Sequence, residues 1–311
     1  MCGFLVVGSS ELELQVFNDA LNQAAYRGPD HQHVSINNGI TWGFNRLSIM
    51  DLSSKGNQPF VYKDCVLVCN GEVYNYHSLK AMLETDYTFK SGSDCEVLIP
   101  LYHKYGIEIL CKFLDAEFAM VIYDAKKDKI LAARDPMGIR PMFYGYHKED
   151  GKICFASEAK GLFPLCQEIM PFPPGHNYED GKFICYNDLS NPKTINNDDL
   201  ETIATNLRLK LEKAVEKRLQ SDAPIGYLLS GGLDSSLVCA IAARLNDQPI
   251  KTFAIGMDTD PIDSKYAKQV ADYLGTDHTE VIMTKEDLLE NLRDVIFHLE
   301  TYDITTIRAS M

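Results

Sequence analysis

Met1-Cys2-Gly3 opens the chain and leads into the apolar run Phe4-Leu5-Val6-Val7. When the initiator methionine is removed, which a small second residue permits, Cys2 carries a free α-amino group beside its own thiol. This amine titrates near about pH 8, so its neutral form can act as a general base. Nucleophile and base then lie on one residue, as in enzymes with an amino-terminal threonine. The alternative is a structural cysteine in a first strand, Cys2 to Val7. The choice between a catalytic and a structural cysteine depends on residues further along the chain.

Length and composition are those of a globular protein with two domains. The chain has 311 residues, of which 45% are hydrophobic and 24% charged, and these values exclude a disordered chain. Its formal charge of −14 argues against a general nucleic-acid surface, which needs clustered Lys and Arg. A bound phosphate would therefore be held locally, by backbone amides or a metal.

The nine cysteines are scattered from Cys2 to Cys239 without a CxxC pair, which argues against a secreted disulfide scaffold and against structural zinc. At the start of the chain no basic segment precedes an apolar one. No run approaches about 18 apolar residues, so the sequence predicts neither a signal peptide nor a membrane span. We expect a cytoplasmic protein that binds neither nucleic acid nor a membrane.

The first part of the chain, to residue 187, is predicted to consist of short strands and two helices. Apolar or alternating segments bounded by Gly, Pro, Asp or Asn predict strands at Gly3–Val7, Ile40–Ser48, Cys65–Cys69, Phe118–Asp124, Lys129–Arg134, Met142–Tyr146 and Lys152–Ala156. Apolar residues three and four apart predict helices at Leu12–Tyr26 and Asp94–Tyr105. Ser91-Gly92-Ser93-Asp94 is expected to cap the second helix.

Residues 188–199, DLSNPKTINNDD, are polar and predict a linker. After them, apolar residues recur every four positions from Ile203 to Leu219, which predicts a helix with a continuous apolar stripe. Strands and helices then alternate, which predicts a parallel sheet with right-handed crossovers. The predicted elements are strands Ile225–Leu229, Ile250–Gly256 and His278–Met283, and helices Ser235–Leu245, Ser264–Leu274 and Glu286–His298.

A glycine-rich loop follows the first strand of this predicted sheet: Ser230-Gly231-Gly232-Leu233-Asp234-Ser235-Ser236. Its glycines let the backbone approach a ligand, and the amides at the helix start point toward an anion. No lysine follows the glycines, so the loop is not a Walker loop. It resembles the PP-loop of the ATP pyrophosphatases, which cleave ATP between the α- and β-phosphates. The alternative is a simple turn in which Asp234 or Ser235 caps the helix.

Four further residues could complete an amide-hydrolysing site around Cys2. Arg46 could clamp a substrate carboxylate through two hydrogen bonds, and Asp94 could bind an α-ammonium. Asn70 and Gly71 could donate a side-chain amide and a backbone N–H to an oxyanion, a contribution of about 3–4 kcal/mol per donor. Each also has a structural explanation: a surface ion pair for Arg46, a helix cap for Asp94 and a hairpin turn for Asn-Gly.

Together these motifs resemble glutamine-dependent asparagine synthetase of the B type. In the first part the resemblance rests on Met1-Cys2-Gly3, Arg27-Gly28-Pro29-Asp30, Arg46-Leu47-Ser48-Ile49, Asn70-Gly71-Glu72-Val73-Tyr74-Asn75, Gly92-Ser93-Asp94-Cys95-Glu96, Arg134-Asp135 with Gly138, and Ala156-Ser157-Glu158. In the second part it rests on Ser230 to Ser236 and on the segment from Glu300 to Ser310. The motifs follow the family's order along the whole chain.

The resemblance implies an α+β N-terminal-nucleophile αββα sandwich followed by an α/β parallel-sheet PP-loop ATP pyrophosphatase domain. It places a class II glutamine amidotransferase domain at residues 1–187, the linker at 188–199 and the N-terminal part of the synthetase domain at 200–311. Cys2 would attack the amide of glutamine, with Asn70 and Gly71 as oxyanion donors, and release ammonia. The residues that would contact glutamine are Arg46, Leu47, Ser48, Ile49, Met50, Asn70, Gly71, Glu72 and Asp94.

In the second domain, the resemblance implies that ATP and Mg²⁺ activate aspartate as an adenylate, and that ammonia arriving through a tunnel then yields asparagine, glutamate, AMP and pyrophosphate. The residues implied for ATP are Leu229, Ser230, Gly231, Gly232, Leu233, Asp234, Ser235 and Ile255, with Asp234 also at the metal. Those implied for the adenylate are Thr305, Thr306 and Arg308.

The sequence departs from the family at its end, because the family's Ser-Gly-Glu-Gly-Ser-Asp-Glu motif and a basic residue after it are absent. We expect a fragment of a longer enzyme, with one side of the second domain uncovered. The alternatives are a split enzyme with a complementing C-terminal chain, or a decayed copy. A homodimer also stays open. Two other functions compete with the synthetase: a stand-alone glutaminase, and a non-catalytic binding protein in which Cys2 has no role.

Overall fold

Three β-sheets organise the protein in this computed structural model, which describes residues 1–9, 11–192, 194–259 and 262–310. The chain divides into two units, Met1–Ile195 and Asn196–Met311. This division falls inside the polar segment 188–199. The first unit contains two antiparallel sheets of six strands each, and the second contains one parallel sheet of three strands.

The first sheet is built around β1, whose position fixes that of Cys2. β1 pairs antiparallel with β3 on one side and with β9 on the other. Its residues are all buried, so the strand is covered on both faces. The strands of this sheet, in spatial order, are β10 (Cys166–Pro171), β8 (Phe143–His147), β9 (Ile153–Ala156), β1 (Gly3–Val7), β3 (Ile40–Arg46) and β2 (His31–Asn37).

The second sheet has β5 and β6 at its centre, paired from Cys65 with Asp124 to Val73 with Ala116. Its spatial order is β12 (Lys182–Cys185), β11 (His176–Glu179), β7 (Lys129–Arg134), β6 (Ala116–Asp124), β5 (Cys65–Val73) and β4 (Phe60–Tyr62). The helices of this unit are α1 (Leu14–Asn22), α2 (Tyr76–Leu83), α3 (Leu98–Tyr105) and α4 (Ile107–Phe113), with 3₁₀ turns at Ala25–Arg27, Ser54–Gly56, Asp94–Val97 and Ala159–Gly161.

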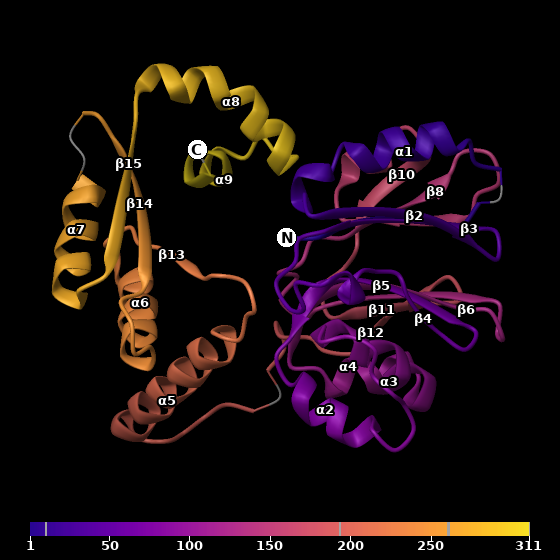
Figure 1. The fold of residues 1–311 in the computed structure, drawn as a ribbon, viewed down its shortest axis with the longest axis horizontal. Coiled ribbons are helices and arrows are strands. Elements are labelled where there is room, and N and C mark those ends of the chain that lie inside the picture. The colour runs from indigo at the N-terminus through magenta and orange to yellow at the C-terminus, as the bar shows by residue number, and fades with distance from the viewer. Residues whose placement is uncertain (10, 193, 260–261, 311) are drawn as a thin grey trace. The chain divides into compact units, whose positions relative to one another are not determined.

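These elements form four layers, with α1 outside the first sheet and α2, α3 and α4 outside the second (Figure 1). The alternation of side chains along each strand produces the layers. In β1, Phe4 and Val6 pack between the sheets, whereas Leu5 and Val7 pack against α1. The predicted αββα sandwich is therefore confirmed.

All seven strands predicted for the first unit are present, two of them (Gly3–Val7 and Lys129–Arg134) with the predicted bounds and five with shifted ends, as are both helical segments. The second helical segment is divided, with a 3₁₀ turn at Asp94–Val97 before α3. Pro100 explains this division, since it has no N–H to donate to the carbonyl four residues earlier. The expected cap was wrong, because Ser93 precedes the turn without a side-chain hydrogen bond. Instead, Glu96 accepts the backbone N–H groups of Lys90 and Ser91, both at 2.8 Å.

In the second unit a long helix precedes three alternating strands and helices, and the parallel sheet is confirmed. The sheet order is β13 (Gly226–Leu228), β14 (Lys251–Met257) and β15 (Asp277–Met283). The helices are α5 (Leu200–Arg218), α6 (Leu233–Leu245), α7 (Ile262–Leu274), α8 (Lys285–Leu299) and α9 (Ile304–Ser310), of which α9 was not predicted.

One face of this sheet is covered and the other is exposed. Ala254 on β14 packs with residues of α6 and α7, whereas the alternate residues Phe253 and Ile255 are 37% and 53% exposed. The uncovered side that the sequence led us to expect is therefore present. The stripe along α5 is buried only toward its end, since Val215 is 7% exposed and Leu207 is 62% exposed. Among the described residues, no helix has the length and apolar character needed to cross a bilayer.

Candidate active site

Cys2 lies directly before β1, against the end of β3. Its Sγ is 3.4 Å from both the amide nitrogen and the carbonyl oxygen of Leu47, and the Leu47 N–H donates to it. Burial raises the pKa of the Cys2 thiol, and burial also lowers the pKa of the Met1 amino group below its ordinary value. A thiol that keeps its proton needs a base that acts as the thiol attacks, and the α-amino group of Cys2 could be that base once Met1 is removed.

The segment Arg27-Gly28-Pro29-Asp30 fixes the backbone on both sides of this thiol. Arg27 Nε donates to the Cys2 carbonyl at 2.9 Å, and Arg27 Nη1 is 2.9 Å from Glu158. Asp30 accepts the Ser48 N–H at 2.7 Å. Gly28 lies so close to β3 that a Cβ there would collide with the backbone of Asn45. The motif therefore positions Cys2 and the turn after β3.

Asn70 and Gly71 lie on β5, opposite Ala119 and Phe118 of β6. Asn70 is 1% exposed, and its side-chain Nδ2 has no hydrogen-bond partner within the described part of the chain. A buried donor without an acceptor costs free energy, and an oxyanion would supply the acceptor. At Gly71, a Cβ would lie 2.5 Å from the Glu117 carbonyl oxygen, which explains the glycine.

Two buried carboxyl groups lie near Asn70 in the fold: Glu72 on β5, and Asp94 in the 3₁₀ turn before α3. Burial and the charge of Asp94 raise the pKa of Glu72 to about 8, while Arg140 opposes this shift. Burial also raises the pKa of Asp94, whose Oδ2 accepts the Val73 N–H at 2.6 Å. Glu72 in turn acts electrostatically on Cys2. The structure therefore places the Glu72 carboxyl near the thiol and the Asp94 carboxyl near Glu72, and a cation there would stabilise the ionised form of both.

Arg46 is 5% exposed at the end of β3, and the following loop wraps around its guanidinium. Nη1 donates to the Ser53 carbonyl at 2.6 Å and to Asn57 Oδ1 at 2.7 Å. Nη2 donates to the carbonyls of Met50 and Asp51. The expected two-point clamp through the terminal nitrogens conflicts with this geometry, because these four bonds occupy their N–H groups. A substrate carboxylate would have to reach Nε or displace a carbonyl.

The loop held by Arg46 is joined to the segment that carries Asp94. Asp51 Oδ2 accepts the Gly92 N–H at 2.7 Å. The loop begins with Leu47, Ser48, Ile49 and Met50, and among these residues Leu47 hydrogen-bonds to the Cys2 thiol through both its N–H and its carbonyl. The structure thus brings Cys2, the Arg46 loop and the Asp94 segment together at one end of the sandwich.

In the second unit, the glycine-rich loop joins β13 to α6 as predicted. Gly231 has φ of +76°, and a Cβ there would lie 2.5 Å from the Ala267 nitrogen of α7. The hydroxyls of Ser230 and Ser235 are 3.0 Å apart across the loop. The Ser236 hydroxyl is buried and, among the described residues, has no partner. A phosphate would give these hydroxyls and the free amides of the helix start an acceptor.

The other residues expected at the nucleotide differ in how much of each side chain a ligand could reach. Leu229 is 1% exposed and packs in the core, so only its backbone is available to a ligand. Ile255 is on the exposed face of the sheet. Asp234 is exposed in the first turn of α6, and Mg²⁺ commonly uses one such carboxylate with phosphate oxygens. Among the described residues, no cluster of three His, Cys, Asp or Glu could hold a metal by itself.

Thr305 and Thr306 lie in the first turn of α9, which packs against α8. Both the N–H and the hydroxyl of Thr306 donate to Asp303 at 2.8 Å. The side chain of Arg308, the third residue expected near an adenylate, lies outside the described residues.

Comparison with known families agrees with this geometry. A family model described as a glutamine amidotransferase domain matches residues 1–173, the part of the chain that carries Cys2, Asn70 and Asp94. The chain belongs to the glutamine amidotransferase family. A second family model, described as asparagine synthase, matches residues 206–311 of this amidotransferase.

Its relatives among curated proteins include asparagine synthetases. A probable glutamine-hydrolysing asparagine synthetase of Schizosaccharomyces pombe is 41% identical, over all of this chain and 60% of that protein. Glutamine-hydrolysing asparagine synthetase B of Escherichia coli is 41% identical, over 92% of this chain and 54% of that protein. The chain thus spans little more than half the length of these relatives.

Two solved structures share the fold at low sequence identity. An enzyme described as the allosteric regulatory enzyme of purine biosynthesis aligns with a TM-score of 0.52 and 16% identity, over 91% of this chain and 80% of that one. Glutamine phosphoribosylpyrophosphate amidotransferase from B. subtilis aligns with a TM-score of 0.50 and 17% identity, over 90% and 65%. These alignments support the fold of the amidotransferase.

Arg140 is a residue of the candidate site that sequence reasoning missed. It is 4% exposed, and its Nη2 is 2.7 Å from Glu117 Oε1. Glu117 is the direct cross-strand neighbour of Glu72, and two such like charges repel. Arg140 offsets this repulsion and also acts electrostatically on Cys2. Only the sheet register brings these residues together, so a sequence motif could not reveal it.

The raised pKa of Glu72 predicts a pH dependence of stability. An unfolded Glu ionises near 4.5, whereas folded Glu72 ionises at about 8, so the folded state binds the extra proton between these values. Stability should therefore fall as pH rises from about 4.5 to about 8. Glu72→Gln removes this loss. The melting temperature of the variant minus that of the unchanged protein should therefore be at least about 2 °C higher at pH 8 than at pH 5. Thermal unfolding at both pH values is the measurement, and an equal difference at both would contradict it.

Proposed function

We propose that the first unit hydrolyses glutamine with Cys2 as the nucleophile. The observation that carries this proposal is the buried Asn70 amide nitrogen, which lacks a partner among the described residues, on the strand whose next residues are Gly71 and Glu72. An amide donor held in this state is prepared for an oxyanion that forms during the reaction and is absent before it. Cys2 supplies the thiol that generates such an oxyanion from an amide carbonyl.

In the proposed reaction, the amino group of Cys2 is freed by removal of Met1 and takes the thiol proton as Sγ attacks the amide carbon of glutamine. Asn70 Nδ2 and the Gly71 N–H stabilise the resulting oxyanion. The amine returns the proton to the leaving nitrogen, which departs as ammonia. Water then attacks the thioester, and glutamate leaves while the thiol regains its proton.

The carboxylates and Arg46 provide the recognition of glutamine in this proposal. Asp94 and Glu72 both have raised pKa values because they are buried near one another. The α-ammonium of glutamine would stabilise the ionised form of these carboxyls and lower their pKa values, and this requirement selects a free amino acid over an amide without an ammonium group. Arg46 would meet the α-carboxylate after a rearrangement of its loop contacts, or through Nε.

We further propose that the second unit uses ATP and Mg²⁺ to activate aspartate, so that the complete activity is glutamine-dependent asparagine synthesis. Ser230, Ser235 and Ser236 with the loop amides would hold ATP phosphates, and Asp234 would hold Mg²⁺. The metal would neutralise phosphate charge when bound. Ile255 offers an apolar surface for adenine, and Thr305, Thr306 and Arg308 are proposed at the aspartyl group. The similarity to the asparagine synthase family supports this assignment.

Product analysis tests both levels of the proposal. The purified chain is given glutamine, with and without ATP, Mg²⁺ and aspartate, and glutamate and asparagine are quantified. Glutamate in every reaction is the expected result for the first unit. Asparagine in the complete reaction alone, from this chain or from the longer enzyme of which we expect it to be a part, is the expected result for the second unit. Glutamate without asparagine from either protein would favour a stand-alone glutaminase. Absence of glutamate from all reactions would contradict the proposal for the first unit.

A further inference from the structure

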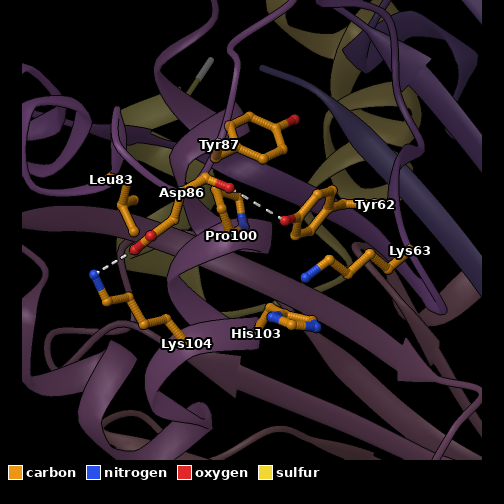
Figure 2. A pocket seen from close by; sticks show the side chains of 8 residues that line it. All are labelled: Tyr62, Lys63, Leu83, Asp86, Tyr87, Pro100, His103 and Lys104. Atoms are coloured by element: carbon orange, nitrogen blue, oxygen red, sulfur yellow. Dashed lines mark hydrogen bonds and ion pairs between the residues drawn. The ribbon is translucent and has the colours of Figure 1, made fainter.

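A cleft of about 270 Å³ lies between the turn that joins β4 to β5 and one side of α3, outside the site described above. Tyr62 lines it from the end of β4 and Lys63 from the turn, and His103 and Lys104 line it from α3. Figure 2 shows the amine of Lys63 and the ring of His103 extending into the same space. Two cations, an imidazole and the Asp86 carboxylate, which is paired with Lys104, therefore border one small cleft.

The aromatic walls of this cleft are fixed by contacts of their own. The Tyr87 hydroxyl donates to Glu96 Oε1 at 2.8 Å. The rings of Tyr62 and Tyr87 meet edge to face with centroids 4.7 Å apart, and Tyr62 meets His103 in the same way at 5.4 Å. A ligand would thus enter a site that is already formed, which reduces the entropic cost of binding.

Lys63 has an unusual backbone conformation for a lysine. Its φ is +51°, in the left-handed region that glycine, asparagine and aspartate occupy more easily. Its ammonium lies 5.0 Å from the centroid of the Tyr62 ring, a contact that leaves its N–H groups available for an anion. A strained residue whose side chain borders a cleft is a reason to look for a function.

Positive charge also surrounds the cleft, although the whole chain carries −14. Lys104 is paired with Asp86 at 2.7 Å, and Lys127 with Asp124 at 3.0 Å. Lys63 and Lys126 contribute further positive charge beside these ion pairs, and both lower the pKa of His103. The pKa of His103 is lowered, first by burial and then by Lys63, Lys126 and Lys127, with Asp124 opposing. A local positive field on an acidic protein attracts small anions.

We propose that this cleft binds a small oxyanion, a phosphate or carboxylate group, between the Lys63 ammonium and the His103 imidazole. The volume admits an inorganic phosphate or a small organic acid, and excludes a long polyanion. The anion would stabilise the charged form of His103, so its binding and the protonation of His103 favour each other. Affinity should therefore increase as the pH falls through the pKa of His103. The protonation of His103 also depends on the charged groups near it and along the cleft, which are Lys63, Lys104, Lys126, Lys127, Asp86 and Asp124.

Lys63→Asn is the sharpest variant, because asparagine loses the charge but accommodates the left-handed conformation better than lysine. The intact chain is titrated with inorganic phosphate at constant ionic strength, and the NMR signals of the His103 ring are followed at pH 6 and pH 8. Lys182→Asn on β12, which removes an exposed lysine outside the cleft, is the matched control.

The expected result is a saturable shift of the His103 signals that is stronger at pH 6, with a rise in the His103 pKa when phosphate is bound. Lys63→Asn should weaken phosphate binding at least about fivefold, since it removes one charged donor, and Lys182→Asn should leave it unchanged. Equal shifts with chloride in place of phosphate, or equal affinity in Lys63→Asn, would overturn the proposal. A preserved melting temperature shows that the variant is folded.

Discussion

Cys2→Ala is expected to lower glutamine hydrolysis by at least about 10³-fold, to the limit of detection. The substitution removes the only atom proposed to bond with the substrate, so donors such as Asn70 would be left without a reaction to assist. Glutamate release is the measurement. When the same substitution is made in a full-length relative, asparagine synthesis from free ammonia should persist, because free ammonia does not need the thiol.

Cys185→Ala is the matched control for this experiment. Cys185 is the exposed cysteine among those described, at the end of β12, so a general effect of losing a thiol should appear there as well. It is expected to retain full activity. Glutamate release by a folded Cys2→Ala protein at the original rate would contradict the nucleophile assignment. Loss of ammonia-dependent synthesis together with glutaminase activity would contradict separate sites.

Asn70→Ala should lower kcat for glutamine hydrolysis by about 10²–10³-fold, with a smaller change in KM. The reason is that the amide nitrogen meets its acceptor only when the oxyanion forms, so its loss raises the barrier more than it weakens the bound substrate. Steady-state kinetics of glutamate release is the measurement. A rise in KM of the same size with an unchanged kcat would show instead that Asn70 binds the amide of the substrate before the reaction.

Asn38→Gly provides the comparison for Asn70→Ala. Asn38 lies between β2 and β3 with φ of +51°, a conformation that glycine accepts, so the variant should fold and remain active. Thermal unfolding of both variants separates a catalytic effect from loss of structure.

The sequence was sufficient for the elements whose side-chain pattern is strong. β1 is apolar throughout and β6 contains the apolar run from Phe118 to Tyr123, and strands and helices alternate clearly after residue 220. β2 was missed because its sequence His31–Asn37 is largely polar and lies at a sheet edge, where burial does not constrain the pattern. α4 was missed because seven residues carry too little periodicity.

The candidate site divides along similar lines. Cys2, Asn70 and Asp94 belong to short motifs, so residue type and spacing were informative. The bonding of Arg46 to its own loop and the position of Arg140 between Glu117 and Glu72 depend on tertiary structure. Residues 117 and 72 meet through the register of β5 and β6, which no local pattern encodes.

Mass spectrometry of the purified chain after reaction with diazo-oxo-norleucine, a glutamine-like electrophile, tests the central claim most directly. One spectrum reports whether Met1 is removed, and peptide mapping identifies the labelled thiol. The account predicts a chain that begins at Cys2, with a single adduct on Cys2 that excess glutamine prevents. A labelled chain that still carries Met1, or an adduct on another cysteine, would contradict it.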